Sequence, residues 1–181
     1  DEDGTIGKAY GYQLGVKHKY KEGEFDQVDR VLYDLKNNPY SRRIMTNIYT
    51  FADLNEMNLY PCAYSMTFNV TGNRLNAILN QRSQDTIMAN NWNVVQYSVL
   101  LHMLAQVSGF EAGELVHVIS DMHIYDRHIP IAEKLIARPS LPAPKFEMNK
   151  DIKNFYDFTV DDFKITDYKY GESVGKIPIA I

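Results

Sequence analysis

The segment "NNWNVVQYSVLLHMLAQVSGF" is the most apolar stretch of the chain and restricts its possible folds more than any other. Its apolar run covers about 16 residues, which is too long for an ordinary strand, and Gly109 follows as a helix stop. The run is therefore predicted to be a helix that lies inside a core. A chain of 181 residues with 45% apolar residues can form such a core as one domain, residues 1–181.

The segments around this helix mix helical and strand patterns. Amphipathic helices are predicted in "DQVDRVLYDLKNNP", with Asp26 as its cap, and in "IPIAEKLIAR", with Pro130 near its start. Strands are predicted in "RRIMTNIYTF", in the hairpin "AYSMTFNVTGNRLNAILNQ" and in "GELVHVISDMHIY", which ends in a loop. Because there is no strict βαβ rhythm, we expect one α+β domain around a mixed sheet.

The two ends of the chain are expected to be less regular. "DEDGTIGKAYGYQLG" contains four glycines and predicts a loop or an irregular edge. "PSLPAPKFEM" is rich in proline and predicts extended chain, and "NFYDFTVDDFKITDYKY" predicts short edge strands. The first residue is not methionine, which is typical of a fragment, a processed product or a trimmed chain.

The composition argues against several classes of partner. The net charge is −4, and Arg42-Arg43 is the clearest cationic pair, so a nucleic-acid partner is not expected. No segment has the length of a membrane span or the pattern of a signal peptide, so no membrane partner is expected. A single cysteine excludes an internal disulfide framework and suits a reducing compartment. We therefore predict a cytoplasmic location.

Cys62 lies in "MNLYPCAYSMTF" at the entrance to a predicted strand. It is either a small core residue or a nucleophile, and a nucleophilic thiolate needs a cationic neighbour. Arg82 follows the second strand of the predicted hairpin, so the hairpin could return it to the beginning of the first strand. These residues alone leave the choice open.

Polar side chains gather in "NQRSQDTIMANNWN", just before the predicted buried helix. Arg82 and Ser83 could bind a phosphate, while Asp85 and Asn93 could form paired hydrogen bonds with a flat heterocycle. The alternative is that this segment only caps the helix, through the side chain of one of three residues. Those three residues are Asn90, Asn91 and Asn93.

The histidines do not have the spacing of a zinc site, and no metal is predicted. His123 and Tyr125 lie on the same face if "SDMHIYDRH" is extended. His102 and His117 are interpreted as core or surface histidines. On a strand, Arg42 and Arg43 would face opposite sides, typically with one exposed and the other paired with a carboxylate.

Taken together, seven motifs resemble the folate-dependent thymidylate synthases over essentially the whole chain. They are "DGTIGKAYGYQ", "LKNNPYSRRI", "MNLYPCAYSMTFNV", "LNAILNQRSQD", "WNVVQYSVLLHMLAQ", "ELVHVISDMHIYDRH" and "KIPIAI". The resemblance implies that family's fold: a large mixed β-sheet packed by helices, with one sheet face used for dimerisation. It also implies reductive methylation of dUMP to dTMP, with methylenetetrahydrofolate as co-substrate.

The resemblance implies a role for each matching residue near the reaction. Cys62 would add to C6 of the uracil ring, which turns C5 into a carbon nucleophile. Arg82 would lie between the thiol and the phosphate, with Ser83 on the same phosphate. Asn93 would face the pyrimidine edge, and Tyr10 would lie near the reacting carbon.

The remaining implied roles concern the sugar, the folate and the second subunit. His123 and Tyr125 would hold the deoxyribose hydroxyl, and Asp85 would bind the pterin ring of the reduced folate. The tail ending at Ile181 would close over the folate and exclude water. Arg42 and Arg43 would reach into the neighbouring subunit to hold its phosphate, which implies a homodimer with shared sites.

Three departures from the family pattern bear on activity. Ala63 stands where the family usually has histidine, and "ANNWN" stands where it usually has Gly-x-Pro-Phe-Asn. The family also has about a third more chain before "DGTIG", so we expect a C-terminal portion that folds but turns over poorly. The alternatives are a non-catalytic nucleotide-binding dimer and a dCMP hydroxymethylase, although that relative is expected to carry aspartate in place of Asn93.

Overall fold

The predicted buried helix is the central helix of the structure, a computed structural model that describes residues 4–179. Helix α3 spans Asn90–Ser108 and ends where Gly109 adopts a left-handed backbone with φ of 79°. Its 19 residues exceed the apolar run because the first turn contains Asn90, Asn91 and Asn93. Although α3 is long, no helix within residues 4–179 is both long and apolar enough to cross a membrane.

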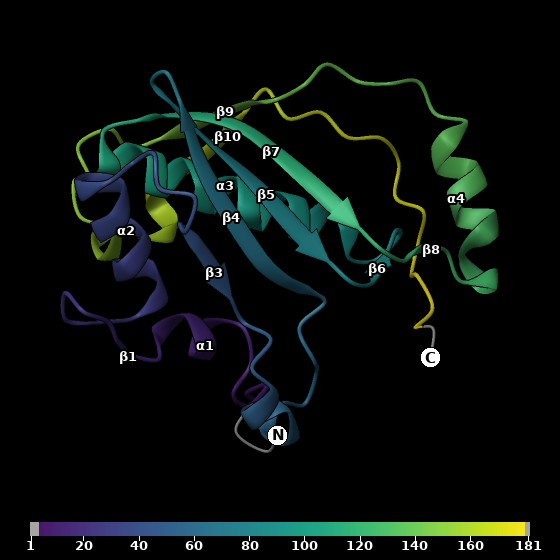
Figure 1. Cartoon of the computed structure of the whole chain (residues 1–181). Coiled ribbons are helices and arrows are strands. Elements are labelled where there is room, and N and C mark those ends of the chain that lie inside the picture. Colours follow the sequence, from purple (N-terminus) through teal and green to yellow (C-terminus); the bar gives the residue numbers. More distant parts are fainter. Residues whose placement is uncertain (1–3, 180–181) are drawn as a thin grey trace.

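A four-stranded mixed sheet packs against α3 (Figure 1). The strand order is β3 (Met45–Asn47), β4 (Ala63–Thr71), β5 (Arg74–Gln81) and β7 (Glu111–Ile119). β3, β4 and β5 are antiparallel neighbours, whereas β5 and β7 run parallel with α3 as their connection. The α+β class, the mixed sheet and the hairpin formed by β4 and β5 are confirmed.

The core lies between this sheet and the helices α2 and α3. Inward-facing residues alternate along β5, where Leu75, Ala77 and Leu79 are each at most 1% exposed. Helix α2 (Gln27–Asn37) adds Val31 and Leu35 to the same cluster. As predicted, α2 is capped by Asp26, whose carboxylate accepts a hydrogen bond from the backbone N–H of Asp29.

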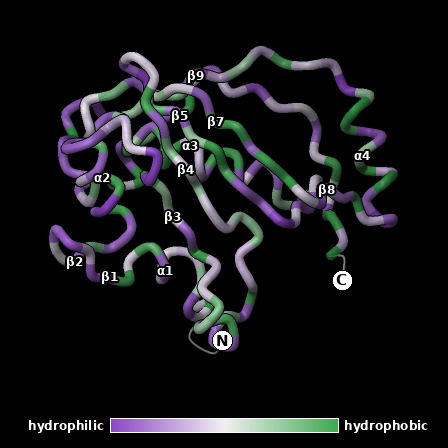
Figure 2. The backbone as a smooth tube through the Cα atoms, in the orientation of Figure 1, coloured by the Kyte–Doolittle hydropathy of each residue, from purple (hydrophilic) through white to green (hydrophobic). Residues whose placement is uncertain are grey.

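The predicted second amphipathic helix is α4 (Ile129–Ile136), with Pro130 in its first turn. Alternating green and purple bands along α4 in Figure 2 display its amphipathic pattern. The other elements are short. They are α1 (Gly11–Gly15), β1 (His18–Lys19), β2 (Glu24–Phe25), η1 (Phe51–Glu56), β6 (Gln84–Asp85), β8 (Met122–His123), η2 (Asp126–His128), β9 (Lys145–Met148), η3 (Phe155–Asp157), η4 (Val160–Asp162) and β10 (Phe163–Thr166).

Some sequence predictions were wrong in extent. The glycine-rich beginning contains the short helix α1, and the strand predicted from residue 42 onward is reduced to β3. β3 is an edge strand, and the side chain of Gln27 binds the N–H and the carbonyl of Asn47 on its outer side, at 2.7 and 2.9 Å. The expected edge strands near the C-terminus include two 3-10 turns, the second closed by a capping box between Thr159 and Asp162.

Candidate active site

The hairpin brings Cys62 and Arg82 together, as the sequence predicted. Cys62 directly precedes β4, Arg82 directly follows β5, and the N–H of Arg82 donates to the carbonyl of Cys62 at 2.9 Å. The Arg82 guanidinium donates to the carbonyls of Tyr60 and Pro61, and its Nη2 lies 3.9 Å from Cys62 Sγ. These two carbonyls therefore fix a cation beside a partly exposed thiol.

Tyr10 forms the other side of this arrangement. Its hydroxyl oxygen accepts a hydrogen bond from the backbone N–H of Cys62 at 3.1 Å. Burial raises the pKa of the Tyr10 phenol, so the hydroxyl keeps its proton at neutral pH. The backbone of Tyr10 has φ of 47°, a strained conformation for a residue with a bulky side chain.

Ala63 is 0% exposed at the first position of β4. A histidine ring is several times larger than the methyl group of alanine, so it would not fit this position without displacing its neighbours. The chain therefore builds its site without an imidazole next to Cys62.

Asn93 lies in the first turn of α3 and is held from the sheet by Gln81. The Nε2 of Gln81 donates to the Ser83 carbonyl at 2.8 Å and to Asn93 Oδ1 at 3.4 Å. His117 Nε2 lies 2.9 Å from Gln81 Oε1, and burial lowers the pKa of His117. Because that oxygen can only accept, a neutral His117 donates to it, which fixes the orientation of the Gln81 amide.

Sequence reasoning missed Gln81, and it interpreted His117 only as a core or surface histidine. Gln81 is 1% exposed and occupies an inward position of β5. A glutamine at an inward position of a strand whose other inward residues are apolar needs specific partners. That mismatch is the signal that could have identified it.

Asp85 stabilises the turn before α3, and none of the asparagines caps that helix. Its Oδ1 accepts from the backbone N–H groups of Ile87 and Met88, at 3.0 and 3.1 Å. The N-cap of α3 is Ala89, which has no capping side chain, so the alternative of an asparagine cap is not realised. Asp85 thus holds the turn that leads into α3.

His123 and Tyr125 come together as predicted. Their rings meet edge to face, with centroids 5.2 Å apart, and His123 Nδ1 lies 3.2 Å from Asp121 Oδ1. The parallel pair β6 and β8 places Asp85 opposite His123. These residues thus follow the neighbouring parallel strands β5 and β7, where ligands commonly bind in open sheets.

Arg42 and Arg43 do not join this cluster within one chain. Both lie in an exposed turn before β3, whereas β3 approaches the Cys62 end of β4 through its other end, at Asn47. No ion pair joins either arginine to a carboxylate within residues 4–179, so the expected pairing of one of them is wrong. Ile181 lies outside the described residues.

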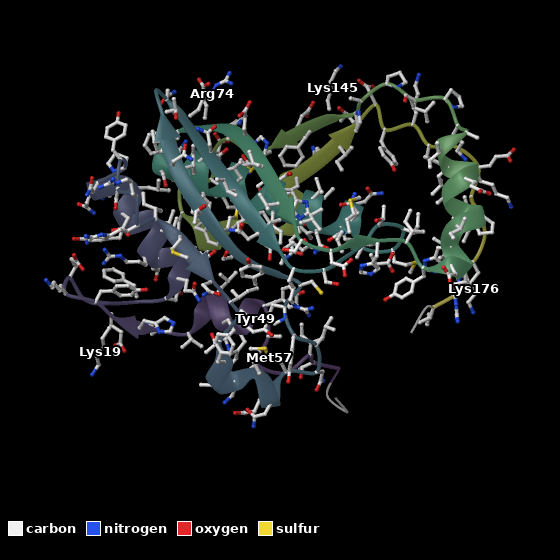
Figure 3. All side chains as sticks on the ribbon, turned by 45° about the vertical axis from the view of Figure 1, so that its right-hand side comes forward. Lys19, Tyr49, Met57, Arg74, Lys145 and Lys176 are labelled. Atoms are coloured by element: carbon white, nitrogen blue, oxygen red, sulfur yellow. The ribbon has the colours of Figure 1, made fainter. Side chains whose placement is uncertain are left out.

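A cavity of about 330 Å³ opens beside Arg82. Its lining is mostly aromatic and contains Asn47, Tyr49, Phe51, Tyr64 and Arg82. Figure 3 shows Tyr49 at the end of the sheet opposite Arg74. Within residues 4–179, no three His, Cys, Asp or Glu side chains gather into a group that could hold a metal ion.

The family model for thymidylate synthase matches residues 1–181. The chain belongs to the thymidylate synthase family. It is 49% identical to thymidylate synthase of Bacillus licheniformis over 174 residues, which cover 96% of this chain and 62% of the relative. It is 46% identical to thymidylate synthase of Bacillus phage phi3T, with the same coverage.

The fold agrees with that assignment. The structure of thermostable thymidylate synthase A from Bacillus subtilis superposes with a TM-score of 0.91 at 44% identity, covering 96% of this chain and 63% of that one. The resemblance and the thymidylate synthase fold are thus confirmed. The chain spans about three fifths of the length of these relatives.

Proposed function

We propose that this chain carries the nucleotide-binding and nucleophilic part of a thymidylate synthase, which converts dUMP to dTMP with methylenetetrahydrofolate. The observation that carries the proposal is the 3.9 Å distance between Arg82 Nη2 and Cys62 Sγ. A cation fixed beside a partly exposed sulfur is the environment that a cysteine nucleophile needs.

In the proposed reaction, the Cys62 thiolate adds to C6 of uracil and the electron pair moves to C5. C5 then attacks the one-carbon unit of the folate and forms the new carbon–carbon bond. Loss of the C5 proton and of the folate leaves an exocyclic methylene, which a hydride from the folate reduces to methyl. The thiolate departs from C6, and the products are dTMP and dihydrofolate.

Asn93 would select uracil. Since Gln81 Nε2 donates to Asn93 Oδ1, the Nδ2 of Asn93 points away from Gln81 and can donate to O4. The second lone pair of Oδ1 can accept the N3 proton. Cytosine offers the reverse pattern, so dUMP should bind this chain more tightly than dCMP, and the opposite preference would favour the hydroxymethylase alternative.

The phosphate would bind to Arg82 and Ser83, with His123 and Tyr125 on the sugar hydroxyl and Asp85 on the pterin. The partner subunit would supply the exposed pair formed by Arg42 and Arg43. The dimer is supported by a row of outward side chains aligned across all four strands of the sheet. These residues are Met45, Thr67, Ile78 and Val116.

Most of these side chains are apolar, which is unusual for a sheet face that is exposed to solvent. Met45, Ile78 and Val116 are 46%, 36% and 48% exposed, and Val118 beside them is 47% exposed. A second copy placed on this face would cover all four side chains. In sedimentation velocity, we expect dimers of the wild-type chain and monomers of Val116→Glu, and a wild-type monomer would contradict the shared-site proposal.

The decisive experiment incubates the chain with 5-fluoro-dUMP and methylenetetrahydrofolate, followed by mass spectrometry of the peptide that contains Cys62. Fluorine cannot leave C5 as a cation, so the thiol, nucleotide and folate should remain joined. We expect an adduct on Cys62 and none in Cys62→Ser. Absence of the adduct, with the nucleotide still bound, would overturn catalysis by this chain alone. Absence of the adduct also in a chain restored to the length of its relatives would favour the non-catalytic alternative.

A mixing experiment tests whether the sites are shared. Neither the Cys62→Ser chain nor a chain with both Arg42→Ala and Arg43→Ala should form much adduct alone. Mixed dimers contain one site with an intact cysteine and a partner that supplies intact arginines. We therefore expect mixing to restore adduct formation, and a mixture no better than its components would contradict the borrowed arginines.

A further inference from the structure

The C-terminal strap, residues 171–179, has no regular secondary structure and is mostly exposed. It runs along α4 (Figure 1), and Lys176 lies beside the end of that helix in Figure 3. A Cβ added at Gly171 would lie 3.5 Å from the Arg138 guanidinium, which follows α4. The strap nevertheless has a defined position, which two side chains of η2 account for.

Arg127 and His128 hold the strap by successive backbone carbonyls. Arg127 Nη1 donates to the carbonyl of Ile179 at 2.8 Å, and His128 Nε2 lies 2.7 Å from the carbonyl of Pro178. A carbonyl oxygen can only accept, so Nε2 of His128 carries the proton and donates. Because both contacts use the main chain, they depend on the path of the strap and not on its side chains.

His128 is an unusual residue for a surface anchor, because it is 0% exposed. Its Nδ1 is buried and has no hydrogen-bond partner within the described part of the chain. Burying Nδ1 without a partner is unfavourable, so other contacts of His128 must compensate. Within the described residues, the side-chain hydrogen bond of His128 is made to the strap.

The same histidine touches the residues assigned to the sugar. The Tyr125 ring meets His128 edge to face at 5.7 Å and His123 edge to face at 5.2 Å. The three rings form a continuous row from the proposed sugar site to the carbonyl of Pro178. A shift of the Tyr125 ring when a nucleotide binds would therefore move His128, which holds the carbonyl of Pro178.

We propose that Arg127 and His128 are positioning residues that clamp the strap, and that the row His123–Tyr125–His128 couples the clamp to nucleotide binding. The coupling rests on the proposed function, whereas the clamp does not. Coupling between two sites is reciprocal, so a bound nucleotide must tighten the strap as much as a clamped strap tightens the nucleotide.

The clamp is tested without ligand by digesting the chain with carboxypeptidase Y and following the loss of Ile179 and Pro178 by mass spectrometry. Arg127→Ala removes a charge-assisted hydrogen bond and should accelerate this loss about fivefold to tenfold. Arg127→Lys should fall between the two. Lys134→Ala, an exposed position of α4, is the matched control and should behave as wild type. Equal rates for Arg127→Ala and wild type would overturn the clamp.

His128 is tested by its tautomer, because a substitution at a fully buried position could unfold the chain. Nitrogen NMR of the wild-type chain should report a proton on Nε2, and deletion of residues 177–181 should change the His128 signals while those of His18 stay the same. Unchanged His128 signals after the deletion would contradict the contact with Pro178.

The coupling is tested by repeating the digestion with saturating dUMP. Without ligand, Arg127→Ala loses Ile179 faster than wild type by a measured ratio. Saturating dUMP should slow the loss of Ile179 from wild type by at least that ratio. If calorimetry detects no binding of dUMP, the proposed function is wrong. The clamp is then still tested by the digestion without ligand. If dUMP binds and the digestion rate is unchanged, the coupling is wrong.

Discussion

The hydroxyl oxygen of Tyr10 accepts the backbone N–H of Cys62 at 3.1 Å, across 52 residues of sequence. This contact ties the short helix α1, which begins at Gly11, to the hairpin that carries the thiol. The N-terminal part of the chain thus determines the local backbone of the nucleophile.

Tyr10→Phe should lower the free energy of unfolding by about 1–3 kcal/mol, because the N–H of Cys62 loses its acceptor while the ring still fills its site. Urea unfolding followed by circular dichroism measures the change. Tyr12→Phe is the control, since Tyr12 is 48% exposed and its loss of a hydroxyl should change little. Equal stabilities of the two variants would show that the hydrogen bond contributes nothing.

Arg82→Met should slow the alkylation of Cys62 by iodoacetamide at neutral pH by about tenfold, because the thiolate loses its neighbouring cation. Labelling is followed by mass spectrometry on the single cysteine. Arg74→Met lies on the same hairpin but at its exposed far end, so it should label at the wild-type rate. An unchanged rate in Arg82→Met would remove the basis for calling Cys62 an activated nucleophile.

The chain should lose stability at alkaline pH, partly through Tyr97. Burial raises the pKa of Tyr97 to about 12, with a smaller contribution from Tyr10. Since the folded pKa exceeds the ordinary value of 10.0, the stabilising contribution is complete below pH 10 and is lost as the pH rises toward 12. The loss is on the order of 2–3 kcal/mol.

Urea unfolding between about pH 8 and about pH 12 tests this contribution. This range begins below the ordinary tyrosine pKa and ends near the raised pKa of Tyr97. Tyr97→Phe should flatten the decline, whereas Tyr168→Phe, at a position 63% exposed, should not. Identical pH profiles for wild type and Tyr97→Phe would show that ionisation of Tyr97 does not lower the free energy of unfolding in this range.

Gly113→Ala should destabilise the junction of β5 and β7. A Cβ at Gly113 would collide with Asn76 Oδ1 and lie 2.9 Å from the carbonyl of Leu75, where the register between the strands shifts. We expect a loss of at least about 1–3 kcal/mol in thermal or urea unfolding. Gly11→Ala, which meets no atom within 4 Å, is the control and should be close to neutral.

The hairpin could be predicted from sequence because its information is local. Alternating side chains and a glycine turn specify β4 and β5, and pairing them places Arg82 next to Cys62 without further knowledge. The helix α3 was equally accessible, since its apolar run is longer than any strand. Here short-range patterns determine the geometry of the site.

Most of the remaining parts of the site depend on contacts that no local pattern contains. Arg42 and Arg43 lie in an exposed turn that is held by local bonds, from Ser41 N–H to the Asn38 carbonyl and from Arg43 N–H to Ser41 Oγ. The hold of Gln81 on Asn93 requires knowing where α3 begins. The contact of His128 with Pro178 spans 50 residues and ends on a carbonyl, which every residue possesses.

Because Cys62 lies at the open end of the hairpin, its reactivity can be used to follow folding of the sheet. Its sulfur meets the guanidinium next to the Ala63↔Gln81 pair, so the labelling rate reports whether the open end of the hairpin is paired. As the chain has no second cysteine, no engineered dye or tag is needed to follow its assembly in real time.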